Sequence, residues 1–444
     1  MGDLFGTDGI RGEVNRHPLK PELILRIGQA LGYFWKEKEY NQQVILGHDG
    51  RLSADYIQNL LSGALQSVGQ EVTKIGLTST PALAAAVARR DTAGGVMISA
   101  SHNPYYDNGI KPFQNTGEKF TDEQEARVEE LIETAIQPAY RDKIGVSTPD
   151  EDSFRPYIDK LTGKFGGVFD SPVLVDCANG GSSQLAPAVL EKICEDVSFI
   201  NNDPDGVNIN RQAGSLHVEV LKEKKAKTGA GVAFALDGDG DRLMAVDEEG
   251  ETVNGDRLLY MLGCYLKEKN KLEGGIVITV MSNLGLRRAL EEAGIDYEVV
   301  GVGDRKVYQK LVERNWILGG EQSGHIIDRS HLSTGDGLHT LVSVLKVLKE
   351  GEKSLAEWNQ QVSEYPQVLQ NFEVDSKPPL GSLEGTVKKI DTVEEELGQE
   401  GRVLVRYSGT EPLARVMLEG KNQNRLEKLA GEIGKVMVEE IEKQ

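Results

Sequence analysis

Short apolar runs alternate with amphipathic helical stretches along most of this 444-residue chain. Runs at 44–46, 72–75 and 96–98 are separated by stretches with helical periodicity at 23–34 and 56–68. Such alternation is typical of βαβ units, in which parallel strands are joined by covering helices. We therefore expect α/β domains built on mostly parallel sheets.

The pattern restarts at strand-like segments 172–176 and 274–280, and it changes character near the C-terminal end. There, alternating segments at 402–406 and 414–419 precede one amphipathic helix at 424–443. The sequence predicts an α/β protein with three similar α/β domains in series, followed by a smaller α+β domain. The expected domain extents are 1–152, 153–253, 254–368 and 369–444.

Three short motifs at strand ends echo one another: His48-Asp-Gly-Arg51, Asp239-Gly-Asp-Arg242 and Gly303-Asp-Arg305. So short a match also arises by chance. The echo therefore supports repeated domains only weakly.

The formal net charge of −20 excludes a general binder of nucleic acid or of an anionic membrane, because the field of the chain repels phosphate. Three scattered cysteines indicate neither a disulfide framework nor a zinc site. The sequence shows no apolar run of membrane-spanning length and no signal-peptide pattern, so we expect a cytoplasmic protein. It leaves the oligomeric state open, with a homodimer among the states it allows.

Ser101 and His102 stand in a tight turn directly after the strand-like run at 96–98. Asn103-Pro104 ends the strand, so the turn holds the serine hydroxyl on a short, stiff support. We expect that hydroxyl to be exposed and reactive. A serine at such a place also commonly caps the next segment, and this turn alone does not decide between the two.

Asp237, Asp239 and Asp241 alternate with glycines after the apolar run at 232–236. Glycines let the backbone fold tightly enough for three carboxylates to converge, and such hard oxygen ligands suit Mg²⁺. A solvated acidic loop is the alternative. A calcium loop is disfavoured, because the motif follows a strand rather than a helix. A serine and a cation site on strand-end loops together indicate phosphoryl chemistry.

Arg406-Tyr-Ser-Gly-Thr410 presents a guanidinium, hydroxyls and the amides of a glycine turn at a strand end. Arginine forks and nests of amides hold phosphate groups, and Arg415 can supply a second fork. A turn with a surface arginine is the alternative. The sequence of this loop therefore predicts a binding site for the phosphate group that is not being transferred.

Glu321 and Ser323 follow a strand-like segment and would point the same way on an extended backbone, toward sugar hydroxyls. His325 is either a proton shuttle or a satisfied core histidine. Lys111 can neutralise charge near Ser101 or, with a lowered pKa, exchange a proton. Arg11 is a second clamp. Cations also lie at other positions in or beside these motifs, which predicts a basic cleft: Arg242, Arg305 and Lys306.

Five motifs stand in one order: Gly6-Thr-Asp-Gly-Ile-Arg-Gly12, Ala100-Ser-His-Asn-Pro104 with Tyr106-Asp-Asn-Gly-Ile-Lys111, Asp237-Gly-Asp-Gly-Asp-Arg242, Gly320-Glu-Gln-Ser-Gly-His325 and Arg406-Tyr-Ser-Gly-Thr-Glu-Pro412. Over nearly its full length the chain resembles the α-D-phosphohexomutase superfamily, most closely its phosphoglucosamine mutase branch. Gln212-Ala-Gly-Ser-Leu-His217 departs from that branch.

The resemblance implies an isomerase that interconverts glucosamine 6-phosphate and glucosamine 1-phosphate for amino-sugar nucleotide and cell-wall precursor synthesis. Ser101 would carry a phosphate, and one of its oxygens would bind Mg²⁺ together with Asp237, Asp239 and Asp241. A 1,6-bisphosphate would turn over in the cleft. The residues implied for sugar and phosphate binding are Glu321, Ser323, Arg406, Ser408, Gly409, Thr410 and Arg415.

Three other functions stay open. A glucose or mannose phosphate mutase needs the same machinery and differs in contacts to the C2 substituent. A metal-dependent serine phosphatase would release free phosphate, but the chain shows no cluster of metal-binding histidines. A non-catalytic sugar-phosphate sensor would lack a motif residue, and none is missing.

Overall fold

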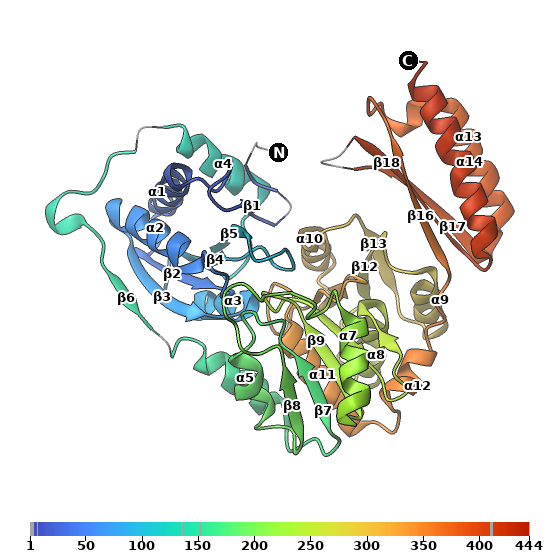
Figure 1. Cartoon of the computed structure of the whole chain (residues 1–444), viewed down its shortest axis with the longest axis horizontal. Coiled ribbons are helices and arrows are strands. Elements are labelled where there is room, and N and C mark those ends of the chain that lie inside the picture. The colour runs from blue at the N-terminus through green and yellow to red at the C-terminus, as the bar shows by residue number, and fades with distance from the viewer. Residues whose placement is uncertain (1–3, 7, 135, 151, 409–411, 444) are drawn as a thin grey trace. The chain divides into compact units, whose positions relative to one another are not determined.

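A computed structural model describes residues 4–6, 8–134, 136–150, 152–408 and 412–443. The chain forms two units, one made of residues 1–279 and 295–360 and the other of residues 280–294 and 361–444 (Figure 1). The larger unit holds three sheets, and the smaller holds one.

The first sheet has a parallel centre and an antiparallel edge. Its strands lie in the order β1 (Ile10–Glu13), β5 (Asp107–Gln114), β4 (Gly94–Ile98), β2 (Gln43–His48), β3 (Glu71–Leu77) and β6 (Ser147–Pro149). β4, β2, β3 and β6 run parallel, whereas β5 pairs antiparallel with both β4 and β1. The predicted parallel sheet is confirmed for the centre. The antiparallel edge was not predicted, because β5 mixes Asp, Asn, Lys and Pro with its apolar residues.

Helices cover both faces of this sheet: α1 (Pro21–Glu37), α2 (Ala54–Ser67), α3 (Thr80–Arg89) and α4 (Asp122–Ile132). Side chains alternate between the faces along each strand. Val44 and Val96 pack with α1, α2 and α4, whereas Ile45 and Met97 pack with α3. This two-sided burial explains why the central strands are continuous apolar runs.

The second sheet repeats this plan in the order β11 (Thr252–Val253), β10 (Leu243–Val246), β9 (Val232–Leu236), β7 (Val173–Asp176) and β8 (Val197–Ile200). Its helices are α5 (Arg155–Phe165), α6 (Leu185–Leu190) and α7 (Val218–Thr228). β9 runs parallel to β7 and then turns back as antiparallel β10. The turn between β9 and β10 carries the three aspartates, so a tight hairpin holds them.

The third sheet has the order β13 (Tyr297–Val300), β12 (Ile276–Thr279), β14 (Leu318–Gly320) and β15 (Ile326–Asp328). Its helices are α8 (Gly255–Glu268), α10 (Asp304–Arg314), α11 (Gly337–Glu350) and α12 (Leu355–Gln360). The start of α11 joins the second sheet's hairpin, because the Gly337 amide donates to the Gly240 carbonyl at 3.0 Å. The second and third sheets are therefore linked beside the aspartates.

The smaller unit is an antiparallel sheet in the order β16 (Gln367–Glu373), β18 (Leu413–Gly420) and β17 (Gly401–Tyr407). It packs on α13 (Glu384–Leu397) and α14 (Gln423–Ile441). Leu426, Leu429 and Ile433 of α14 cover Val416 and Leu418. Three α/β sheets followed by a small α+β part confirm the predicted fold class, while the predicted domain boundaries remain predictions.

The helix α9 (Leu284–Glu292) belongs to the smaller unit, although it follows β12 in the chain. The buried Glu419 accepts the amide of Leu284 at 2.9 Å, so a carboxylate sits at the helix N-terminus. Arg402 pairs with Glu419 and donates to the carbonyls of Val280 and Ser282 at 2.7 and 2.8 Å. These long-range contacts have no local sequence pattern.

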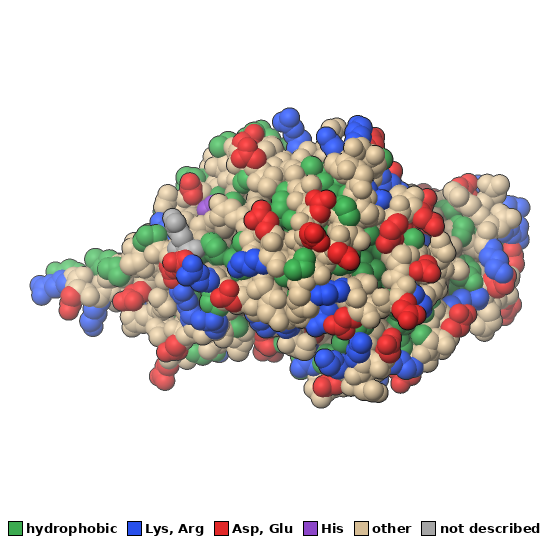
Figure 2. Space-filling model, turned by 90° about the horizontal axis from the view of Figure 1, so that it is seen from below, with side chains coloured by type: hydrophobic (Ala, Val, Ile, Leu, Met, Phe, Trp, Pro, Cys, Tyr) green, Lys and Arg blue, Asp and Glu red, His purple; other side chains and the backbone are tan. Residues whose placement is uncertain are grey.

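None of the described helices combines the length and apolar character needed to cross a membrane. On the face drawn in Figure 2, Asp and Glu side chains lie interspersed with Lys and Arg. Short 3₁₀ turns at Arg141–Lys143, Leu380–Ser382 and Gly398–Glu400 complete the regular structure.

Candidate active site

The loop between β4 and β5 holds Ser101 in a strained conformation. Its φ is 52°, a left-handed backbone that costs a non-glycine residue about 1–3 kcal/mol. Ser101 is buried, so the predicted exposure is wrong, and its Oγ donates to Asp237 Oδ2 at 2.9 Å. His102 Nδ1 lies 3.4 Å from that Oγ, and burial together with the charges of Arg242 and Arg11 lowers the pKa of His102 to about 4. The loop therefore aims the hydroxyl at a carboxylate.

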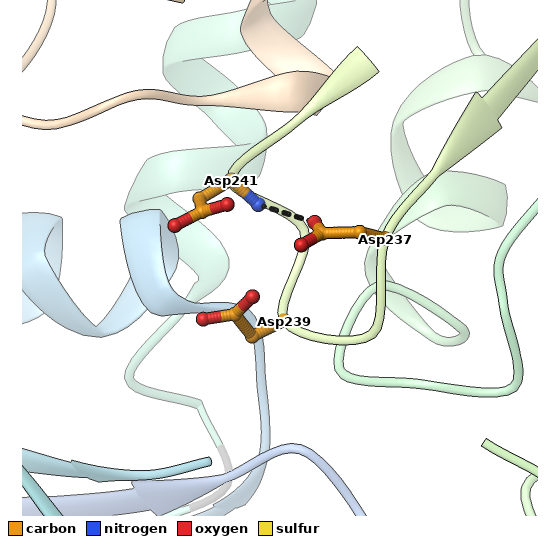
Figure 3. A group of neighbouring side chains, drawn as sticks. All are labelled: Asp237, Asp239 and Asp241. Atoms are coloured by element: carbon orange, nitrogen blue, oxygen red, sulfur yellow. Dashed lines mark hydrogen bonds between the residues drawn. The ribbon is translucent and has the colours of Figure 1, made fainter. Parts of the chain in front are cut away.

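The hairpin after β9 brings Asp237, Asp239 and Asp241 together, as their spacing predicts. One carboxylate oxygen from each lies within 4.8 Å of the others, and all three residues are buried (Figure 3). Asp237 Oδ1 accepts the amides of Asp241 and Arg242 at 3.1 and 3.2 Å, which closes the turn. Gly238 is required, because a Cβ there would lie 2.6 Å from the Ser101 carbonyl oxygen.

Two oxygens of this group fit a cation. Asp239 Oδ1 and Asp241 Oδ1 are buried and have no hydrogen-bond partner among the described residues. Burial raises the pKa of Asp237 well above its usual value, and the charges of Asp241 and Asp239 raise it further. Buried carboxylates that repel one another and lack donors are stabilised by a metal ion. The triad can therefore hold a metal.

Lys111, on β5, lies beside the triad. Its buried Nζ is 2.6 Å from Asp239 Oδ2 and 2.8 Å from Asp8 Oδ2. Burial alone would lower the pKa of Lys111, but the charges of Asp239 and Asp8 outweigh it and raise the pKa. The amine therefore stays charged, and the lowered pKa that proton exchange would need is absent. Thr80 Oγ1 also donates to Asp239 Oδ2, at 2.6 Å.

Asp8 extends this charged group in a way that the sequence did not reveal. It pairs with Lys119 at 2.6 Å, and Lys119 also pairs with Asp304 at the start of α10. Arg11 pairs with Asp8 as well and reaches the Ala100 carbonyl. Asp8 and Asp304 stand in motifs that the sequence shows, but Lys119 has no local signal, because its partners come from distant segments.

A cavity of about 410 Å³ opens over this group within the larger unit. Acidic and basic side chains line it in similar numbers: Asp8, Asp241, Asp304, Glu321, Arg11, Lys119, Arg242 and His325. The predicted basic cleft is therefore wrong for this unit, because carboxylates hold its cations. Arg305 pairs with Glu125 and Asp122, and Lys306 is exposed outside the cavity lining.

Glu321, Ser323 and His325 lie between β14 and β15. The backbone turns there, because the Gly324 amide donates to the Glu321 carbonyl at 3.0 Å, so the extended conformation expected for Glu321 and Ser323 is wrong. Glu321 lines the cavity and accepts the Gly303 amide at 3.1 Å, whereas Ser323 is exposed and outside the lining.

His325 is buried against the hairpin that carries the three aspartates. Its Nδ1 lies 3.5 Å from Asp241 Oδ2, and its Nε2 accepts the Gly335 amide at 3.1 Å. Burial opposes protonation, but the charge of Asp241 outweighs it and raises the pKa of His325. The bond from Gly335 requires a lone pair on Nε2, so the neutral ring carries its proton at Nδ1, toward Asp241.

The smaller unit gathers cations around the loop after β17. Arg406 and Arg415 stand directly opposite each other on neighbouring strands. Burial, together with the charge of Arg415, lowers the pKa of Arg406. Lys377 Nζ, which the sequence did not single out, donates to the Ser408 carbonyl at 2.6 Å. Facing guanidiniums favour an anion between or above them. Gly409 and Thr410 lie outside the described residues.

Comparison with known proteins assigns a family to the chain. Models for phosphoglucomutase/phosphomannomutase match four successive parts: α/β/α domain I at 2–139, domain II at 155–250, domain III at 254–365 and the C-terminal domain at 369–436. A phosphoglucosamine mutase of Ruminiclostridium cellulolyticum is 42% identical over 98% of this chain and 99% of its own length. One from Acetivibrio thermocellus is 42% identical over 99% of this chain and all of its own length.

Solved structures share the fold. A phosphoglucomutase/phosphomannomutase family protein from Burkholderia thailandensis has a TM-score of 0.82 at 22% identity, covering 98% of this chain and 97% of its own. An Aspergillus fumigatus N-acetylphosphoglucosamine mutase, solved with GlcNAc-6P and magnesium, has a TM-score of 0.70 at 18% identity, covering 99% and 96%. With its full-length relatives at 42% identity, the chain belongs to the phosphoglucomutase/phosphomannomutase family of isomerases, alongside its phosphoglucosamine mutases.

Proposed function

We propose that this chain interconverts glucosamine 6-phosphate and glucosamine 1-phosphate through a phosphorylated Ser101. The observation that carries the proposal is the bond of Ser101 Oγ to Asp237 within a buried triad of carboxylates. Relatives that match the chain end to end are phosphoglucosamine mutases, which supports the hexosamine substrate.

The reaction has two phosphoryl transfers, each balanced within the site. First, the bond from phosphorus to Ser101 Oγ breaks and a bond from phosphorus to the free sugar hydroxyl forms. That hydroxyl loses one proton, and Ser101 Oγ gains one. The 1,6-bisphosphate then reorients so that its other phosphate faces Ser101. The bond from that phosphorus to the sugar oxygen breaks and a bond to Ser101 Oγ forms, while Ser101 Oγ loses one proton and the sugar oxygen gains one.

The chain's own residues prepare these transfers. Asp237, Asp239 and Asp241, with an oxygen of the phosphorylated Ser101, would hold Mg²⁺, whose preferred ligands are hard oxygens. When bound, the ion neutralises charge on the transferring group. The charged Lys111 holds Asp239 in place and adds positive charge beside it.

Two groups of residues are proposed to bind the sugar phosphate. Glu321 lines the cavity and offers a carboxylate to sugar hydroxyls, and Arg11 is a cavity cation that reaches the Ala100 carbonyl beside Ser101. Arg406, Ser408 and Arg415 would hold the phosphate that is not reacting. His325 is the proposed proton carrier, because it is the imidazole in the cavity lining.

Two assays test this function. Turnover on glucosamine, glucose and mannose phosphates should favour the glucosamine substrate, and a preference for another sugar would assign a different mutase. Free phosphate should stay far below product, whereas stoichiometric release would indicate a phosphatase. Both assays are run on Ser101→Ala and on Ser67→Ala, a matched change in α2 far from the loop in sequence.

A further inference from the structure

The motif His48-Asp-Gly-Arg51 has no part in the proposed transfers, yet Arg51 lies against the Ser101 loop. It follows β2, the parallel neighbour of β4, so both strands end at the same sheet edge. Arg51 is only 2% exposed. A fully buried arginine is rare unless all of its donors are satisfied, which calls for a reason at this position.

All five N–H groups of the Arg51 side chain are used. Nε donates to Asp49 Oδ2 at 2.9 Å. The other four reach backbone carbonyls of the Ser101 loop, namely those of Ser101 at 2.8 Å, Asn103 at 2.9 Å, Asp107 at 3.0 Å and Pro104. A guanidinium has five N–H donors in a fixed arrangement. Asp49 accepts one of them, and the carbonyls of this loop accept the other four.

Asp49, the carboxylate partner of Arg51, fixes the amide of Ser101 through Ser99. Ser99 Oγ donates to Asp49 Oδ2 at 2.5 Å and accepts the Ser101 amide at 2.9 Å. The carbonyl of Ser101 is bound by Arg51 and also by Asn210 of the second α/β domain, at 2.9 Å. The amide and the carbonyl of Ser101 are thus both fixed, while its Oγ stays outside this network.

We propose that Arg51 is a positioning residue for phosphoryl transfer, which holds the backbone of the Ser101 loop so that Oγ keeps facing Asp237. This inference rests on the proposed role of Ser101. The serine must return to one place after each transfer, with and without its phosphate. Bonds to the backbone alone achieve this, because they do not change when Oγ is modified. Arg51 has no bond to Oγ and does not line the cavity, so it acts on the reaction rather than on substrate binding.

The two motifs that resemble His48-Asp-Gly-Arg51 end in Arg242 and Arg305, and neither arginine has the role proposed for Arg51. Arg242 lines the cavity, and Arg305 pairs with Glu125 and Asp122 of α4. Of the three motifs, only the first has an arginine that bonds carbonyls of the Ser101 loop among the described residues.

The test replaces Arg51 by lysine. Lysine keeps the charge beside Asp49 but has three N–H donors, so at least two of the five acceptors lose their bond to this side chain. We expect kcat to fall by ten- to a hundredfold, roughly the loss for a reacting group displaced by about 1 Å, with KM within about twofold of the wild type. Hydrogen exchange should quicken at the amides of Ser101, Asn103 and Asp107. Arg329→Lys is the control, because Arg329 also donates to two carbonyls, those of Leu311 and Trp316, away from the loop.

Each outcome decides the matter. Wild-type kcat with unchanged exchange, or a change confined to KM, would overturn the positioning role. If Arg51→Lys does not fold, Ser99→Ala takes its place, since it removes only the bond to the Ser101 amide and its link to Asp49. It should lower kcat with KM kept, and unaltered kcat would overturn the role. A wild-type enzyme that turns over with no phosphate on Ser101 would overturn the proposed function as well, whereas a phosphorylated wild type beside an unaffected variant overturns the positioning role alone.

Discussion

The triad region around Ser101 and the loop after β17 both concentrate charge, but they do so in opposite ways. In the triad region cations pair with carboxylates, as Lys111 does with Asp239 and Asp8, and Lys111 and the three aspartates are buried. After β17, the half-buried Arg406 and Arg415 face each other, and burial together with the charge of Arg415 lowers the pKa of Arg406. The first arrangement is held by ion pairs within the chain, whereas we propose that a bound anion stabilises the second. Under the proposed function, the first region would stabilise the transition state and the second would bind the phosphate that is not reacting.

The largest effect should come from Ser101→Ala, which tests the fixed region. We expect turnover to fall by several orders of magnitude, because the group that accepts the phosphate is gone. The fold should persist with a modest stability loss of about 1 kcal/mol, since the removed hydroxyl is buried and bonded to Asp237. Initial rates and thermal unfolding measure the two effects. Retention of a substantial part of kcat would exclude a phosphoserine mechanism.

Asp239→Asn should come next. It weakens the triad and the bond to Lys111, so we expect kcat to fall by about a hundredfold or more, with a smaller change in KM. Stability should also fall by about 1.5–3 kcal/mol, the worth of a charged hydrogen bond. Kinetics at rising Mg²⁺ concentration check the first effect, and a change in KM alone would mark the triad as a sugar site.

Arg406→Ala probes the other region and should show the reverse pattern. Losing a charged hydrogen bond of about 1.5–3 kcal/mol should raise KM by roughly ten- to a hundredfold, while kcat falls less. The bisphosphate should also escape more often, so turnover would come to depend on added glucosamine 1,6-bisphosphate. Kinetics with and without that compound decide it. Unchanged KM and no dependence would reduce Arg406 to a surface charge.

The smallest effect is expected from Lys377→Met. Its amine bonds the Ser408 carbonyl at the base of the same loop, so its loss should raise KM about fivefold, the equivalent of about 1 kcal/mol. Lys388→Met, on α13 in the same unit, is the matched control. A fall in kcat instead of a rise in KM would contradict the assignment of this region to substrate binding.

Local patterns carried much of the prediction. Apolar runs marked β2, β4 and β9, and the turns after β4 and β9 placed Ser101 and the aspartates, because each pattern lies within a few residues. β5 was not predicted, because its sequence mixes polar with apolar residues although most of the strand is buried. The exposure of Ser101 was misjudged, because its cover comes from the hairpin of another sheet.

Non-local contacts were beyond the sequence. Lys119 joins Asp8 to Asp304 across three distant segments, and Asn210 reaches the Ser101 loop from more than a hundred positions away. The docking of α9 with the smaller unit depends on Glu419, far along the chain. Such pairs have no spacing rule, because only the folded chain brings their partners together.

The most direct measurement follows a labelled phosphate on Ser101. The chain is phosphorylated with labelled glucosamine 1,6-bisphosphate, freed of it, mapped by mass spectrometry and then mixed with glucosamine 6-phosphate. The label should sit on Ser101 and pass into sugar phosphate within the time of one turnover, with Ser67→Ala behaving like the wild type. Label found at another residue, or label on Ser101 that stays there while product forms, would contradict transfer through Ser101.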